Sequence, residues 1–170
     1  DLLSTMASWA DSTGHPLLEK REERKILGIV ITSDKGLCGA FNTNLLEKGL
    51  SYLEKKASSC EIRLVLIGKK ATRFFKKHPF PIVRSYPDQI QDLSQEDFDD
   101  LSYFIMRLYV LRETDAVYAV YNEFKSILAP RITITQLLPF EPPMRRAEEE
   151  KIKAGDNLSG LQPIWEPGIA

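Results

Sequence analysis

Apolar residues follow one another without a polar break from Ile26 to Ile31, and shorter apolar runs recur at later points of the chain. Runs of this kind are typical of strands covered on both faces in a sheet. Between them, apolar residues recur every three or four positions, which is the period of an amphipathic helix. The pattern predicts strands at 26–32, 62–67, 81–86, 116–121 and 131–138, and helices at 41–57, 69–77 and 94–108.

The order of these elements indicates the fold class. Strands that alternate with helices are typical of an α/β protein, so we expect a three-layer Rossmann-like domain with a mostly parallel sheet of about five strands. The strand at 26–32 should be central, because it is apolar almost throughout. Only residues 122–130 join the last two strands, too few for a crossover helix, and these strands should therefore form an antiparallel edge hairpin.

The chain divides into three segments by composition. Residues 1–25 begin with apolar residues at helical spacing and end in a run of mixed charge, which predicts the end of a helix and a solvated connector. Residues 26–140 hold the predicted globular domain. Residues 141–170 are rich in Pro, Glu and Lys up to Gly160, which predicts a mobile loop followed by a short segment in which Pro167 could begin a helix.

Composition narrows the classes of function. The 170 residues suffice for one core, and 43% hydrophobic and 28% charged residues are typical of a soluble globular protein. No stretch approaches the roughly 18 apolar residues of a membrane-spanning helix. A net charge of -1 lacks the basic excess of a nucleic-acid-binding protein. Cys38 and Cys60 form no disulfide framework or zinc pattern, which favours a reducing compartment, and no targeting peptide is visible.

The turn at 33–42 joins the first predicted strand to the first predicted helix, and its glycines are Gly36 and Gly39. Such turns often bind phosphate. A dinucleotide turn requires the pattern G-x-G-x-x-G, and a phosphate loop requires Ser or Thr where this chain has Lys70. We therefore predict no cofactor. The alternative is a small Rossmann-like nucleotide- or phosphate-binding enzyme that uses the Gly36–Gly39 turn.

No catalytic or metal-binding set is recognisable along the chain. His15 and His78 each stand beside a proline, so neither is placed as a general base. The acidic residues at 97, 99 and 100 fall in the first turns of a predicted helix, where negative charge favours the helix dipole. Cys38 has apolar neighbours, which predicts packing and not reactivity. One short helix carries a basic set that is either a solvated face or a contact for an acidic partner or lipid head groups: Lys69, Lys70, Arg73, Lys76 and Lys77.

The 33–42 turn also carries a specific resemblance. With its flanking residues it closely resembles the signature turn of the gamma subunit of F-type ATP synthases, reading Ile31-Thr32-Ser33-Asp34-Lys35-Gly36-Leu37-Cys38-Gly39-Ala40-Phe41-Asn42-Thr43-Asn44. Later motifs resemble the same family in the same order: Tyr121-Asn122-Glu123-Phe124, Ile134-Thr135-Gln136-Leu137-Leu138-Pro139 and Trp165-Glu166-Pro167. The resemblance implies a Rossmann-like domain without nucleotide, in which the turn residues are structural: Asp34, Lys35, Gly36, Leu37, Cys38, Gly39 and Asn42.

The resemblance also implies a function. In that family this domain stands at the foot of a rotating central stalk, proton flow turns a membrane ring of c subunits, and the catalytic sites lie in the alpha and beta subunits. The chain is therefore expected to be a non-catalytic rotor domain with the epsilon subunit and the c-ring as partners and no homo-oligomer. Its expected place is peripheral, at the cytoplasmic face of a bacterial inner membrane or the matrix or stroma face in an organelle.

Two features qualify the resemblance. The family contacts the alpha and beta subunits through two long terminal helices, of which residues 1–12 and 167–170 resemble only the last and first turns. The close cysteine pair of chloroplast members is also absent. By resemblance, the candidate c-ring and epsilon interface comprises His15, Pro16, Leu17, Trp165 and Glu166, although both segments could merely pack on the domain. An interaction module unrelated to this family is the remaining alternative.

Overall fold

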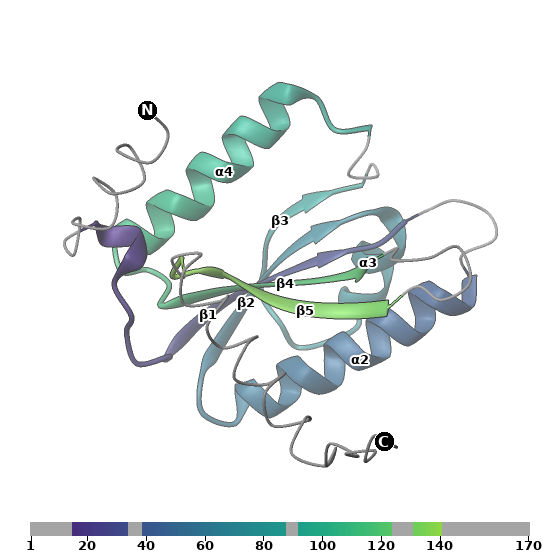
Figure 1. The fold of residues 1–170 in the computed structure, drawn as a ribbon. Coiled ribbons are helices and arrows are strands. Elements are labelled where there is room, and N and C mark those ends of the chain that lie inside the picture. The colour runs from purple at the N-terminus through teal and green to yellow at the C-terminus, as the bar shows by residue number, and fades with distance from the viewer. Residues whose placement is uncertain (1–14, 34–38, 88–91, 124–130, 141–170) are drawn as a thin grey trace, which may run out of the picture. The chain divides into compact units, whose positions relative to one another are not determined.

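A computed structural model describes residues 15–33, 39–87, 92–123 and 131–140. Within these residues, five strands form one sheet in the order β3-β2-β1-β4-β5 (Figure 1). They are β1 (Lys25–Ile31), β2 (Glu61–Ile67), β3 (Ile82–Tyr86), β4 (Ala116–Glu123) and β5 (Arg131–Leu138). The predicted α/β fold is confirmed, and β1 is the central strand.

Strand pairing is parallel except at one edge of the sheet. β1 pairs in parallel with β2 and with β4, and β2 pairs in parallel with β3. β4 and β5 pair antiparallel, which confirms the predicted edge hairpin. β1 is buried from Ile26 to Val30 because helices cover both faces of the sheet.

The described helices are α2 (Gly39–Ala57), α3 (Lys69–Phe75), α4 (Gln95–Val110) and a short 3-10 helix, η1 (Pro16–Leu18). α4 begins with a capping box. The Ser94 hydroxyl accepts from the Asp97 amide at 3.1 Å, and the Asp97 carboxylate accepts from the Ser94 amide at 3.1 Å. The Ser94 hydroxyl also donates to the Asp97 carboxylate at 2.6 Å, and this hydrogen bond, with that from the Ser94 amide, lowers the pKa of Asp97 below its usual value.

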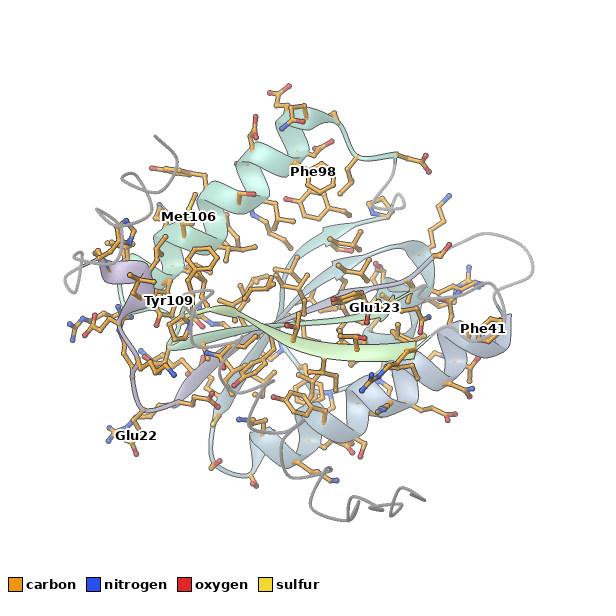
Figure 2. All side chains as sticks on the ribbon, viewed as in Figure 1. Glu22, Phe41, Phe98, Met106, Tyr109 and Glu123 are labelled. Carbon is orange, nitrogen blue, oxygen red and sulfur yellow. The ribbon has the colours of Figure 1, made fainter. Side chains whose placement is uncertain are left out.

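Two apolar cores lie on opposite faces of the sheet (Figure 1). The first joins α2 and α3 to the sheet and includes Leu45, Leu53 and Phe75. The second joins α4 and η1 to the other face and includes Leu17 and Tyr109. Figure 2 shows Tyr109 on the side of α4 that faces η1. The architecture is therefore the predicted three layers.

Several predictions fall on residues outside the described ranges. These are the helix end at 1–12, the turn residues Asp34 to Cys38, and the whole of 141–170 with Trp165 and Glu166. The division of the chain at residues 25 and 140 consequently stays a prediction. None of the helices within the described ranges is both long and apolar enough to span a membrane.

Candidate functional site

The two ends of the signature turn are joined by Asn42. Its side chain, only 1% exposed, lies in the first turns of α2. The side-chain nitrogen of Asn42 donates to the Ser33 carbonyl at 2.5 Å, and the backbone amide of Ser33 donates to the side-chain oxygen of Asn42 at 3.3 Å. One side chain therefore satisfies both backbone groups of the residue that follows β1 and Thr32, and holds the start of α2 beside the end of β1.

Thr32, which follows β1, and Gly68, which follows β2, lie against each other at the carboxyl ends of these strands. The Thr32 hydroxyl, which is buried, donates to the Ile67 carbonyl at 3.3 Å and accepts from the Ala71 amide at 3.2 Å. Gly68 has a φ of 99°, and a Cβ there would lie 2.7 Å from the Thr32 carbonyl oxygen. Only glycine fits this position without strain.

This arrangement bears on nucleotide chemistry. In open α/β sheets, ligands bind outside the carboxyl ends of the strands. Here the Thr32 side chain lies between the ends of β1 and β2, where its hydroxyl bonds to the Ile67 carbonyl and to the Ala71 amide of α3. The protein's own groups therefore fill the space between the ends of β1 and β2. The strand order reverses between β1 and β4, and residues 34–38 and 124–130, which follow these two strands, lie outside the described ranges.

The mixed-charge run before β1 is not simply solvated, which corrects the sequence-based expectation. We define the connector as residues 19–24. The Arg21 side chain is only 10% exposed and donates to the Tyr109 carbonyl at 2.8 Å. Its guanidinium lies 4.4 Å from the centre of the Tyr109 ring, a cation–π geometry. The Tyr109 hydroxyl in turn donates to the Glu19 carbonyl at 2.5 Å.

A second contact of the connector is centred on Glu23. Its carboxylate pairs with the Lys56 ammonium of α2 at 2.5 Å and accepts from the Tyr118 hydroxyl of β4. The Lys56 nitrogen lies 5.2 Å from the centre of the Tyr118 ring. The neighbouring Glu22, in contrast, points away from the fold in Figure 2 and its side chain is 76% exposed.

The pKa values of this cluster reflect these contacts. Burial acts to raise the pKa of Glu23, but hydrogen bonds from Lys56 and Tyr118 and the Lys56 charge outweigh it, and the pKa falls below 4.5. The hydrogen bond to Glu23 raises the pKa of Lys56 above 10.5, against the opposing effect of burial. Both groups therefore remain charged over a wide pH range.

The connector contacts could not be located from the sequence, because Arg21 and Glu23 were indistinguishable from their exposed neighbours by residue type. A weak signal existed. Residues alternate in direction along an extended chain, and the more buried Arg21 and Glu23 alternate with the exposed Lys20, Glu22 and Arg24. A period of two in the charge run would have indicated that one side faces the domain.

Of the candidate interface residues that the structure describes, one is buried and two are exposed. Leu17 is buried in the core beneath α4, and its carbonyl accepts from the Phe140 amide at 2.9 Å. His15 and Pro16 are exposed, and the His15 ring accepts from the Leu17 amide at 3.3 Å. Leu17 thus packs within the domain in the described structure, whereas the role of its neighbours as an interface remains a prediction.

One small cavity of about 150 Å³ lies between the connector, β4 and β5. Its two carboxylates are already engaged: Glu23 as described, and Asp115 by the amides of Arg24 and Lys25 at 3.2 and 2.8 Å. Among the described residues, no three His, Cys, Asp or Glu side chains are grouped as metal ligands would be. The side chains around this cavity therefore join the connector to β4 and β5.

Comparisons with known proteins agree with the resemblance found in the turn. A family model described as ATP synthase matches residues 1–163. The ATP synthase gamma chain of Trichlorobacter lovleyi is 35% identical over 171 residues, covering 100% of this chain and 56% of that protein. This chain therefore spans little more than half the length of that relative.

Two solved structures are similar in fold. The rotor of the Euglena gracilis mitochondrial ATP synthase matches with a TM-score of 0.50 and 22% identity, covering 99% of this chain and 61% of that one. The central stalk and c-ring structure of the Tetrahymena thermophila mitochondrial enzyme gives a TM-score of 0.55 and 17% identity, covering 96% and 67%. At these identities the likeness shows the fold alone.

Proposed function

Because this chain belongs to the ATP synthase gamma-chain family, we propose that it forms the globular domain of a non-catalytic central-stalk subunit. In this role it couples proton flow through a c-ring to ATP synthesis in an alpha/beta head. The observation that carries the proposal is the family match over residues 1–163. The filled edge at Thr32 and Gly68 supports a role without nucleotide chemistry.

The contacts of the connector support a mechanical role. Arg21 contacts α4 on one face of the sheet, and Glu23 contacts α2 on the other face as well as β4. A force applied to the chain before residue 15 would therefore pass into both layers of helices. Close-packed interiors transmit strain with little compression, so a covered sheet is a suitable body for this purpose.

The partners that we propose are the epsilon subunit and the c-ring, with the alpha and beta subunits reached through the shaft helices of the complete protein. The domain would then be peripheral to the membrane, on the face that carries the catalytic head. Exposed His15 and Pro16, together with Trp165 and Glu166, are the proposed contact residues. An aromatic anchor within a polar rim is the usual composition of such a contact.

The experiment is a binding measurement with purified epsilon subunit and with isolated c-ring. The chain should bind both, and Trp165→Ala should weaken binding by about 2 kcal/mol if this aromatic is an anchor. Tyr103→Ala is the matched control, because Tyr103 is an exposed aromatic on α4, with 66% of its surface accessible, outside the proposed contact.

Two outcomes would count against the proposal. A chain that binds neither epsilon nor the c-ring would argue against the stalk role. Unchanged binding in Trp165→Ala, with the same affinity as Tyr103→Ala, would reject the Trp165 contact while leaving the stalk role in place.

A further inference from the structure

Positive charge is concentrated in one part of this nearly neutral chain. Residues 62–87 contain seven Lys and Arg residues and no Asp or Glu. The other 144 residues contain 16 basic and 24 acidic residues. The segment comprises most of β2, together with α3 and β3. The positive charge is therefore concentrated toward the edge of the sheet that β3 forms.

Two of the seven cations are neutralised within the fold. Arg84 of β3 pairs with Asp100 of α4, and Arg63 of β2 lies 3.9 Å from the carboxylate of Glu61. These pairs leave the positive charge on α3 and the turn that follows it.

Five cations remain, and four of them make up what we define as the basic surface: Lys70, Arg73, Lys76 and Lys77. α3 turns Ala71 and Phe75 into the core, where both are fully buried, and leaves the basic residues outside. Arg73, Lys76 and Lys77 are exposed, and Lys70 is half-exposed. Within the described ranges, none of the four forms an ion pair with a carboxylate.

The composition of this surface indicates its partner. Protein interfaces are enriched in aromatic residues and Arg and depleted in Lys, whereas this surface has three lysines and one arginine. No large apolar side chain is exposed between residues 69 and 87. Lysine is a flexible point charge without the planar geometry that recognises a carboxylate in pairs of hydrogen bonds. Such a group suits a fluid surface of many phosphates.

We propose that the basic surface of α3 binds the anionic phospholipid head groups of a membrane. Clusters of four to eight Lys and Arg are typical of such contacts, and each cation adds to the attraction while it lies within a Debye length of the surface. The binding is electrostatic, since no large apolar side chain between residues 69 and 87 is exposed for entry into the acyl region. It therefore weakens as salt is added.

The inference goes beyond the stalk role and does not depend on it. Binding of epsilon and the c-ring tests the family function, whereas binding to vesicles tests the α3 surface of the free chain. Either result can fail while the other holds, so the two failures are distinguishable.

The experiment is sedimentation of the chain with vesicles of equimolar phosphatidylglycerol and phosphatidylcholine, and with vesicles of phosphatidylcholine alone. The chain should bind the first and not the second. The triple variant Arg73→Gln, Lys76→Gln, Lys77→Gln removes three exposed cations and should bind roughly a hundredfold more weakly. Its circular dichroism and melting temperature should match those of the parent chain.

The matched control is the triple variant Lys48→Gln, Lys55→Gln, Arg107→Gln. It removes the same charge from exposed positions on α2 and α4. Binding should be retained within about threefold, because salt screens the attraction between the membrane and charges that lie outside the basic surface. Equal losses in the two variants would overturn the proposal, because net charge alone would then explain binding.

Other results would also overturn it. These are equal binding to both kinds of vesicle, or binding that increases with added salt. A poly-glutamate peptide that binds the chain while anionic vesicles do not would identify an acidic protein as the partner. Inorganic phosphate that displaces the chain from vesicles at micromolar concentration would indicate a site for a single anion.

Discussion

At the scale of single residues, Asn42 shows how a short polar side chain joins two elements. It bonds to both backbone groups of Ser33 while being almost fully buried. Buried backbone groups need such partners, because an unpaired one costs free energy. Gly68 has the complementary role, since its lack of a Cβ lets the backbone lie against Thr32.

Replacing Asn42 by Ala should lower the free energy of unfolding by about 2 kcal/mol, because two buried backbone groups lose their partner. Urea unfolding followed by circular dichroism measures the change. Asn44→Ala is the matched control: Asn44 lies two residues further along α2 and is exposed, and its replacement should leave stability nearly unchanged. Equal midpoints for the two variants would contradict the role of Asn42.

At the scale of elements, the connector is attached to the domain by contacts to a helix on each face of the sheet. Arg21 contacts the C-terminal part of α4, and Glu23 contacts both α2 and β4. Further along, Asp115 accepts from the amides of Arg24 and Lys25. The chain before β1 is thus held by contacts to side chains and backbone far away in the sequence.

The Glu23 contact should make stability depend on acid pH. Its folded-state pKa lies below 4.5, its ordinary value, so its contribution is fully present above pH 4.5 and is lost as the pH falls through the lowered pKa. Glu23→Gln should cost on the order of 1 kcal/mol at neutral pH, less than for a fully buried pair because the site is partly exposed. The cost should shrink below pH 4.5.

Thermal unfolding measured from about pH 3 to about pH 7 tests this dependence, because carboxylates titrate within that range. Glu22→Gln is the control, because the adjacent Glu22 pairs with Arg24 and both side chains are highly exposed. The pH profile of Glu22→Gln should follow that of the parent chain. If Glu23→Gln lowers the free energy of unfolding equally at both ends of the pH range, the carboxylate charge contributes nothing to stability.

At the scale of the whole molecule, the sheet order places β1 at the centre with helices on both faces. A doubly wound sheet of this kind often binds a nucleotide at the carboxyl ends of its strands. In this chain the space between β1 and β2 is taken by Thr32 and Gly68. The fold is therefore of a kind that nucleotide-binding proteins also use, while within the described residues the space between β1 and β2 is filled by the protein's own groups.

Calorimetric titration of the chain with ATP, ADP and NAD should accordingly give no saturable heat at micromolar concentrations. The physical reason is that a phosphate would have to displace the Thr32 hydroxyl from the Ala71 amide and the Ile67 carbonyl. Saturable micromolar binding of any of the three nucleotides would overturn this interpretation of the edge.

Much of the fold could be predicted because local patterns report burial. The apolar run at 26–32 indicated a central strand, and the nine residues between the last two strands indicated a hairpin. The capping box at the start of α4 is equally local, because Ser94 and Asp97 lie three positions apart in the sequence. Leu17 was harder, since an apolar residue beside a proline fits a partner contact and a core position equally well.

The elements, the fold class and the family could be identified from the sequence, because periodicity and short motifs are local properties of the chain. The packing of distant segments was needed to show what fills the space between β1 and β2 and which charged residues hold the connector. Arg21 and Tyr109 are 88 positions apart, and Glu23 and Tyr118 are 95 apart. Periodicity reports whether a side chain is buried but not its partner, since that depends on how distant segments pack.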